Sequence, residues 1–307
     1  MKNPTAEELA FLCARAGRTF DRFPILPRRG DGRMSPESRL RFELSMETIL
    51  ERSRTLGACV VLRRPSGGHE TFCYGRARLL GRAPVTEETC FRVASVSKLV
   101  MTFGTLALVE RGTLNLDEDL SVYLGYPVRH PRFPGAPVTL RMLLTHTAAI
   151  RDEGNYGTRG MQKGCTLREL LENAENWLDA RPGETFHYSN LGAGVAGVAM
   201  ERAANRPFDE LMQELVFAPL SIRASYDPRR IAPRSDLANG YGMRFPVPIL
   251  KYNAQALARR KPEPFDPERD YFCAAGRLIT DSEGMAALLG LLASHGEMGV
   301  LSADSLD

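Results

Sequence analysis

The chain has 307 residues, of which 43% are hydrophobic and 25% are charged, a composition typical of a globular protein with a sizeable core. Its basic residues, 35 arginines and 5 lysines, nearly balance 37 acidic residues and leave a formal net charge of +3. The arginine pairs, such as Arg28–Arg29 and Arg229–Arg230, are scattered along the chain. This distribution predicts solvated surface and excludes a nucleic-acid partner.

The cysteine and histidine spacings predict no metal site. The six cysteines include no C-x-x-C pair, and the five histidines form no H-x-H or H-x-x-x-H pair. No cofactor is implied. The apolar stretch near the N-terminus has about five residues, which is short for a signal peptide, and no run approaches the roughly 20 residues of a membrane span. We therefore expect a cytoplasmic protein with reduced thiols, although Cys59 and Cys73 could be bonded across a hairpin.

The first third of the chain predicts helices followed by a hairpin. We expect a short helix near residues 5–16, then a surface arm rich in arginine, proline and glycine. Ser35 and Pro36 open a helix over residues 36–54, with proline at the first helical position. Two β-prone runs, "GACVVLRR" and "ETFCYGRA", flank "PSGGH", which is typical of a β-hairpin.

The remaining segments are mostly helical in pattern. Capping boxes are predicted at Thr166 with Glu169 and at Thr280 with Glu283. Residues 225–272 are rich in proline and irregular, which favours loops that line a site. The expected helices cover residues 96–111, 139–146 (with a threonine N-cap), 166–178, 190–204, 208–216 and 281–293.

Lys98 is the only charged residue between Val93 and Val109. A charge within an apolar helix is costly unless it is paired. Ser95 precedes it by three residues, so the two side chains share one face of a helix, with the serine in the first turn. An amine beside a serine hydroxyl can accept its proton and so activate a nucleophile. The alternative is a lysine whose amine reaches solvent from a partly exposed helix.

Four segments together resemble the serine β-lactamase and penicillin-binding-protein superfamily, in particular its branch of class C β-lactamases, D-aminopeptidases and family VIII esterases. "FRVASVSKLVMTFGTLALVERG" resembles the first motif, with Ser95 and Lys98 in the matching positions. "VTLRMLLTHTAAI" resembles the segment written LL-T-H-T-S-G, with Ala148 and Ala149 replacing serine and glycine.

The other two segments lie further along the chain. "RPGETFHYSNLGAG" resembles the Y-x-N motif, with Tyr188 and Asn190 in the matching positions. "CAAGRLITDSEGM" resembles the segment that returns to the α/β part, with Arg277 where a second glycine is common. The resemblance covers about residues 40–307.

The resemblance implies an α/β (α+β) fold of the β-lactamase/transpeptidase type, in which helices flank an antiparallel sheet and a mostly helical subdomain is added. Residues 1–40 would form an N-terminal extension and residues 41–307 a serine hydrolase domain. The α/β part of that domain would comprise 41–94 and 276–307, and the helical part 95–275.

The resemblance also implies a mechanism. Ser95 would attack a carbonyl carbon to form an acyl-enzyme, while Lys98 and Tyr188 would share the general-base work. Asn190 would hold the substrate amide or Lys98, and it is also a candidate helix N-cap. The substrate would be a small molecule or short peptide, namely a β-lactam, a D-amino-acid peptide or a small ester. His146 is interpreted as structural, a hydrogen-bonder at a helix end.

The third motif of the superfamily, K-T-G or H-x-G, is absent: no glycine after Asn190 has lysine or histidine two residues before it. We therefore expect a chain that is incomplete at its C-terminus, or a short form, with little sheet beyond the hairpin. The motif's strand supplies one donor of the oxyanion hole, and loss of such a donor costs about 10² to 10³ in rate. The alternative function is thus a non-catalytic binding or scaffold protein. The sequence predicts no oligomeric state.

Overall fold

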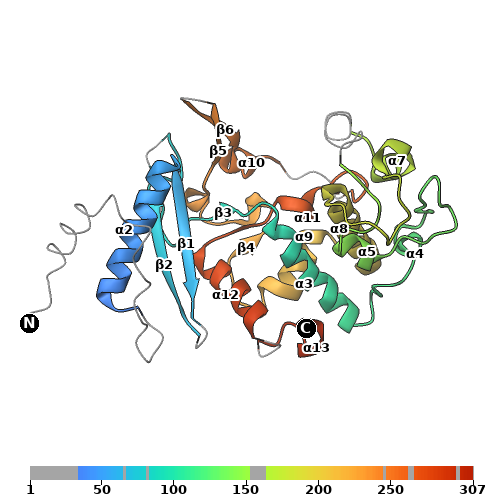
Figure 1. Ribbon diagram of the computed structural model, residues 1–307, viewed down its shortest axis with the longest axis horizontal. Helices are drawn as coiled ribbons and strands as arrows, with labels where there is room; N and C mark the ends of the chain where they lie inside the picture. Colours follow the sequence, from blue (N-terminus) through green and yellow to red (C-terminus); the bar gives the residue numbers. More distant parts are fainter. Residues whose placement is uncertain are drawn as a thin grey trace, which may run out of the picture.

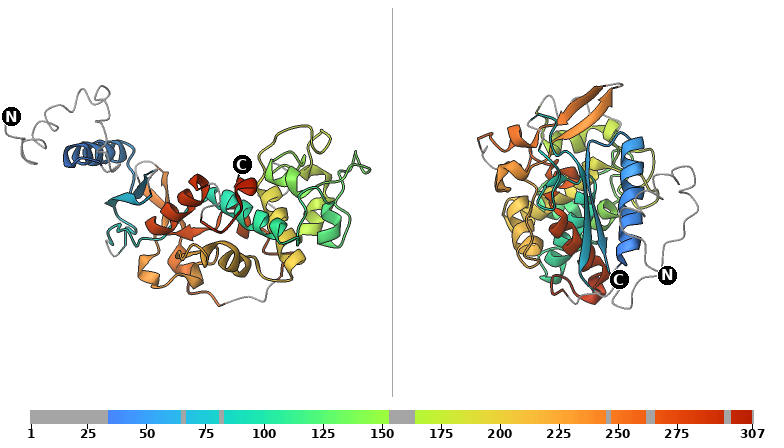
Figure 2. Two further views of the ribbon diagram at one scale, coloured as in Figure 1. Left: turned by 90° about the horizontal axis from the view of Figure 1, so that it is seen from below. Right: turned by 90° about the vertical axis from the view of Figure 1, so that its left-hand side faces the viewer.

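A two-stranded sheet between two helices forms one end of the molecule (Figure 1). Strand β1 (Gly57–Arg63) pairs antiparallel with β2 (His69–Gly75). Figure 2 shows α2 (Pro36–Arg52) on one face of this hairpin and α12 (Ser282–Ala293) on the other. This computed structural model describes residues 34–64, 67–80, 83–152, 164–244, 247–261, 266–294 and 298–306.

The predicted opening of α2 is confirmed, both for Ser35 before the helix and for proline at the first helical position. The side chain of Ser35 accepts a hydrogen bond from the Ser38 backbone N–H, and Pro36 occupies the first helical position of α2. Phe42 of α2 packs edge-on against Phe72 of β2, with ring centroids 6.1 Å apart. The predicted helix at residues 5–16 lies outside the described residues.

Cys59 and Cys73 are directly opposite each other in the hairpin. Their Sγ atoms lie 3.7 Å apart, so the two thiols are in contact and not bonded. Burial raises the pKa of Cys59 to about 12, and the neighbouring Cys73 adds to this effect. Both cysteines are therefore protonated thiols at neutral pH.

A second sheet joins three segments that are distant in the sequence. Strand β7 (Ile279–Thr280) lies in its centre and pairs antiparallel with β3 (Phe91–Arg92) and with β4 (Ala224–Ser225). A further hairpin consists of β5 (Gly240–Arg244) and β6 (Val247–Tyr252). The sheet content thus exceeds the expected single hairpin.

The β5–β6 hairpin corrects the prediction that residues 225–272 are irregular throughout. Pro248 lacks a backbone N–H and obscures the strand pattern, but an edge strand of a two-stranded sheet tolerates it. The other described residues of that region hold short elements, namely the 3₁₀ turns Pro228–Arg230 and Arg234–Asp236 and the helix α10 (Ala254–Leu257). Helix α11 (Cys273–Gly276) follows directly after the region.

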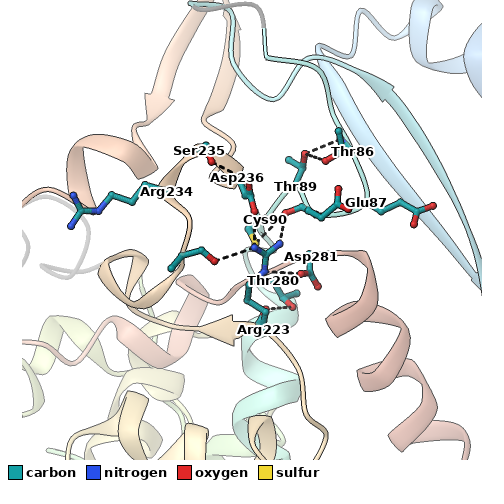
Figure 3. Close-up of polar contacts among 12 residues, drawn as sticks. Thr86, Glu87, Thr89, Cys90, Arg223, Arg234, Ser235, Asp236, Thr280 and Asp281 are labelled. Atoms are coloured by element: carbon teal, nitrogen blue, oxygen red, sulfur yellow. Dashed lines mark hydrogen bonds and ion pairs between the residues drawn. The ribbon is translucent and has the colours of Figure 1, made fainter.

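Arg223, directly before β4, is hydrogen-bonded to three segments that are distant in the sequence (Figure 3). Its Nε donates to Asp281 (2.9 Å), one Nη donates to Asp236 (2.6 Å), and the other donates to the carbonyl oxygen of Glu88 (2.5 Å). The planar guanidinium suits such a junction because its donors point in fixed directions. This single side chain therefore fastens the small sheet to the start of α12.

The N-cap of α12 differs from the prediction. Thr280 belongs to β7, and Asp281 caps the helix by accepting a hydrogen bond from the Gly284 N–H at 2.9 Å. An aspartate caps as well as a threonine and also accepts the ion pair from Arg223. The predicted capping box at Thr280 and Glu283 is therefore wrong. The predicted helix is present and begins at Ser282, one residue later than expected.

Two longer helices contact each other in the main hydrophobic core, α3 (Val96–Glu110) and α8 (Asn190–Ala204). Helix α8 is buried over most of its length because its residues are small and apolar. Gly194 shows why: a Cβ atom there would lie 2.2 Å from the carbonyl oxygen of Tyr271. The shorter helices around them are α4 (Leu120–Leu124), α5 (Leu140–Leu144), α7 (Leu167–Glu172), α9 (Phe208–Met212) and α13 (Ala303–Leu306).

Two predicted helices end as α-helices at least four residues earlier than expected, α7 and α9. The capping box of Thr166 and Glu169 is present, but α7 ends at Glu172 because Asn173 adopts an extended conformation and caps a 3₁₀ turn, Ala174–Asn176. Helix α9 likewise passes into a π-helical turn over Gln213–Phe217. Thr139 caps α5 as predicted. No helix in the described part of the chain is long and apolar enough to cross a membrane.

Candidate active site

Ser95 occupies the N-terminal end of α3 and is exposed. The chain turns sharply there, because β3 ends at Arg92 and the intervening Ala94 has a positive φ of 46°. Ser97 stabilises this turn: its hydroxyl donates to the Ala94 carbonyl and accepts a hydrogen bond from the Leu278 N–H. The turn therefore presents the Ser95 hydroxyl on the surface at the positive end of a 15-residue helix.

Lys98 lies one turn further along α3 and is only 9% exposed. Its Nζ donates to Asn190 Oδ1 (2.8 Å) and to the Ala275 carbonyl (2.6 Å), and lies 3.3 Å from Ser95 Oγ. These three acceptors match the three protons of an ammonium group. The alternative of a lysine that reaches solvent is therefore wrong, because the amine points into the protein.

Tyr188 approaches Ser95 from the other side. Its hydroxyl donates to Ser95 Oγ at 2.8 Å, and Lys98 Nζ lies 4.9 Å from the centre of its ring. Partial burial raises the pKa of the Tyr188 phenol, but the nearby ammonium of Lys98 and the hydrogen bond with Ser95 outweigh burial. The net pKa of Tyr188 is lowered from its usual value of 10.

Asn190 is the first residue of α8, and its predicted N-cap role belongs instead to Ser189, whose hydroxyl accepts the Gly192 N–H. Asn190 Oδ1 faces Lys98, and Asn190 Nδ2 donates to the carboxylate of Asp152 at 2.7 Å. The structure thus brings all four predicted residues together, although 92 residues separate Lys98 from Asn190.

His146 lies beside this cluster, directly after α5, and does not contact Ser95 among the described contacts. Its ring packs against Tyr188 with centroids 4.6 Å apart, and its Nδ1 faces the Ser189 N–H at 3.3 Å. Burial lowers the pKa of His146, and the positive charge of Lys98 lowers it further. The predicted hydrogen bond of this histidine near a helix end is present, and its structural role stays a prediction.

Two groups in this cluster were not predicted from the sequence. The Ala275 carbonyl comes from α11, and the Asp152 carboxylate lies just beyond the "LLTHTAAI" segment. Free N–H groups at the start of α8 do predict an acceptor nearby, but no local pattern identifies which acid supplies it. Among the described residues, no group of three or more His, Cys, Asp or Glu is placed to hold a metal ion.

A serine oxygen between an ammonium and a phenol has two groups at hand for proton transfer, which is the arrangement of an activated nucleophile. With its antiparallel strands flanked by helices, the chain has the β-lactamase/transpeptidase-like fold. The family model described as Beta-lactamase matches residues 45–306. The chain therefore belongs to the beta-lactamase family.

Several relatives are similar in sequence or structure. Esterase EstB of Burkholderia gladioli is 33% identical over 62% of this chain and 53% of its own length. The D-alanyl-D-alanine-carboxypeptidase/endopeptidase AmpH of Escherichia coli K12 is 30% identical over 50% of this chain and 41% of its own. An octameric penicillin-binding protein homologue from Pyrococcus abyssi superposes with a TM-score of 0.69 at 22% identity, over 87% of this chain and 58% of that one. The chain thus spans about half the length of the curated relatives.

Proposed function

We propose that this protein is a serine hydrolase that forms an acyl-enzyme through Ser95 and acts on a small ester or amide. The observation that carries the proposal is the position of Ser95 Oγ, 2.8 Å from the Tyr188 hydroxyl and 3.3 Å from Lys98 Nζ. A serine hydroxyl is a weak nucleophile unless a neighbouring group takes its proton. Both neighbours are held in place by contacts within the cluster.

The Tyr188 hydroxyl, which donates to Ser95 Oγ in this structure, first loses its proton to solvent. In the acylation step, the resulting phenolate accepts the Ser95 proton while Oγ attacks the carbonyl carbon. The lowered pKa of Tyr188 favours this phenolate, and the Lys98 ammonium beside it stabilises the negative charge. The proton then passes to the leaving alcohol or amine as its bond to the acyl carbon breaks. In deacylation, a water molecule gives a proton to the same phenolate and attacks the ester carbonyl. As the bond between the acyl carbon and Ser95 Oγ breaks, the Tyr188 phenol returns that proton to Oγ, which releases the acid and restores the Ser95 hydroxyl and the phenolate.

Exposed apolar side chains beside the nucleophile support a substrate with an apolar group. Val96 and Leu99 on α3 and Phe186 on the approach to Tyr188 are large hydrophobic residues left on the surface. Phe186 packs edge-on against His146, with ring centroids 6.0 Å apart. The esterase activity named for one relative is consistent with such a substrate. We therefore favour small esters over charged peptides.

The second candidate is a non-catalytic binding or scaffold protein. It is favoured by the absence of K-T-G and H-x-G from the sequence, since that motif supplies part of the oxyanion hole in this superfamily. The complete hydrogen-bond cluster around Lys98 counts against it, because a buried ammonium is costly to keep without a use.

Covalent labelling separates the two candidates. A fluorophosphonate or fluorescent penicillin probe should label the wild type, and Ser95→Ala should abolish both labelling and hydrolysis of p-nitrophenyl esters. Ser45→Ala, at a serine on α2 whose hydroxyl donates to the Arg41 carbonyl, is the matched control and should label normally. A folded wild type that neither probe labels and that turns over no ester would support the scaffold instead.

A further inference from the structure

The carboxylate of Asp152 is the hydrogen-bond centre at the start of α8. It accepts four hydrogen bonds, from the Ser189 hydroxyl (2.9 Å), the Asn190 N–H (2.8 Å), the Asn190 side-chain amide (2.7 Å) and the Leu191 N–H (3.0 Å). Two of these donors are backbone groups of the helix N-terminus, where a negative charge is favourable. Asp152 itself does not touch Ser95, Lys98 or Tyr188 among the described hydrogen bonds.

The contact with the Asn190 side chain has a directional consequence. A carboxylate accepts hydrogen bonds and donates none, so it selects the NH₂ end of the amide. With Nδ2 held by Asp152, the oxygen Oδ1 must point the other way, toward Lys98 Nζ at 2.8 Å. The reversed amide would place two donors, NH₂ and ammonium, against each other.

We propose that Asp152 is a positioning residue for the reaction assigned to this site. It orients the Asn190 amide, and Asn190 in turn holds the Lys98 ammonium between Ser95 and the Ala275 carbonyl. The inference deepens the proposed function and rests on it. Its physical content is the order of contacts: Asp152 to Asn190, Asn190 to Lys98, and Lys98 to Ser95.

The kinetic test is a double-mutant cycle with Asp152→Ala, Asn190→Ala and the double variant. All are assayed under conditions in which every variant is folded. The maximal rate of fluorophosphonate labelling should fall about 10- to 100-fold in Asp152→Ala, with the half-saturating probe concentration unchanged. In the Asn190→Ala background, the same substitution should cost less than about threefold, because both act through one amide. Fully additive losses, or wild-type labelling in Asp152→Ala, would overturn the proposal.

Ser189→Ala is the matched control. It removes the N-cap hydroxyl of the same helix and one donor to Asp152, but leaves the contact between Asp152 and the Asn190 amide. It should lower stability while labelling stays within about threefold of the wild type. If Asp152→Ala does not fold, Asp152→Asn replaces it, since it keeps the shape of the side chain. Its NH₂ cannot accept, so the four hydrogen bonds to Asp152 cannot all form, and labelling is expected to slow.

A crystal structure of the Asp152 variant decides the proposal independently of activity. We expect the Asn190 amide to be rotated or displaced, so that its oxygen no longer lies within hydrogen-bond distance of Lys98 Nζ. An unchanged contact between Asn190 Oδ1 and Lys98 Nζ would overturn the positioning role. If the wild type is not labelled at all, the proposed function fails, and this structural comparison still decides the role of Asp152.

Discussion

At the scale of single residues, the burial of Lys98 is the feature with the largest consequences. Its ammonium is nearly inaccessible to water, and its donors are directed at Asn190, Ala275 and Ser95. The Tyr188 ring also lies close to this ammonium, with its centre 4.9 Å from Lys98 Nζ. A buried cation beside a phenol stabilises the phenolate form, which links one lysine to the protonation state of the group next to the nucleophile.

Replacing Lys98 by methionine tests this link. Lys98→Met keeps most of the apolar stem and removes the charge, so the pKa of Tyr188 should rise toward or above the ordinary tyrosine value. The measurement is the tyrosinate absorbance during an alkaline titration, taken as the difference between each protein and its Tyr188→Phe counterpart. A pKa of Tyr188 that stays in place or falls would show that Lys98 does not govern it.

At the scale of elements, the segment between α5 and Asp152 carries part of the backbone strain of the site, besides that at Ala94. His146 and Ala149 both have positive φ values, 57° and 59°. This conformation lets the segment pack beneath Tyr188 and lets the Ala149 carbonyl accept the Leu178 N–H at 2.8 Å. The superfamily motif that the segment resembles has glycine at the position of Ala149, and glycine adopts this conformation without a Cβ penalty.

Ala149→Gly should therefore stabilise the protein. The left-handed conformation costs alanine about 1 kcal/mol, and the greater flexibility of glycine in the unfolded chain offsets part of the gain. We expect the free energy of unfolding in urea to rise by about 0.5 kcal/mol. Ala148→Gly is the control: Ala148 is equally buried but is not among the described positive-φ residues, so glycine there should destabilise. Equal losses for both variants would contradict this account.

At the scale of the whole molecule, stability should depend on a carboxyl group that the fold buries. Glu201 lies near the C-terminal end of α8, is 6% exposed, and accepts the Phe208 N–H at 2.8 Å. Burial raises the pKa of Glu201 to about 8, opposed by that hydrogen bond and by Arg202. The folded protein thus holds this proton more tightly than the unfolded chain, whose glutamates titrate near 4.5.

The sign of the pH dependence follows directly. The stability linked to Glu201 is fully present below about pH 4.5 and is lost as the pH rises toward 8. Glu201→Gln keeps the acceptor for Phe208 and cannot ionise. Its unfolding free energy should therefore exceed that of the wild type by an amount that grows between pH 5 and 8, to on the order of a few kcal/mol.

Chemical denaturation at several pH values measures this difference. Glu214→Gln is the control, because hydrogen bonds from Arg111 and Arg206 lower the pKa of that exposed carboxyl. Its effect on stability should have the opposite sign and be small. A gap between Glu201→Gln and the wild type that does not change with pH would refute the linkage.

The sequence by itself determined the family, the hairpin at residues 57–75, the start of α3 and the identity of the four clustered side chains. These features have local signals, namely periodicity, capping residues and short motifs in a recognisable order. Lys98 could be singled out because a charge within an apolar run needs a partner wherever the helix is placed.

Tertiary structure alone decided which groups contact the predicted site residues and which strands pair. Asp152, the Ala275 carbonyl and the strands β4 and β7 reach their positions through contacts across dozens of residues, and no local pattern encodes such contacts. The N-cap of α12 at Asp281 was likewise decided by the fold, because Thr280 is taken up by strand β7. Hydrogen-bond acceptors are interchangeable in sequence, and only the folded backbone selects which one faces a buried amine.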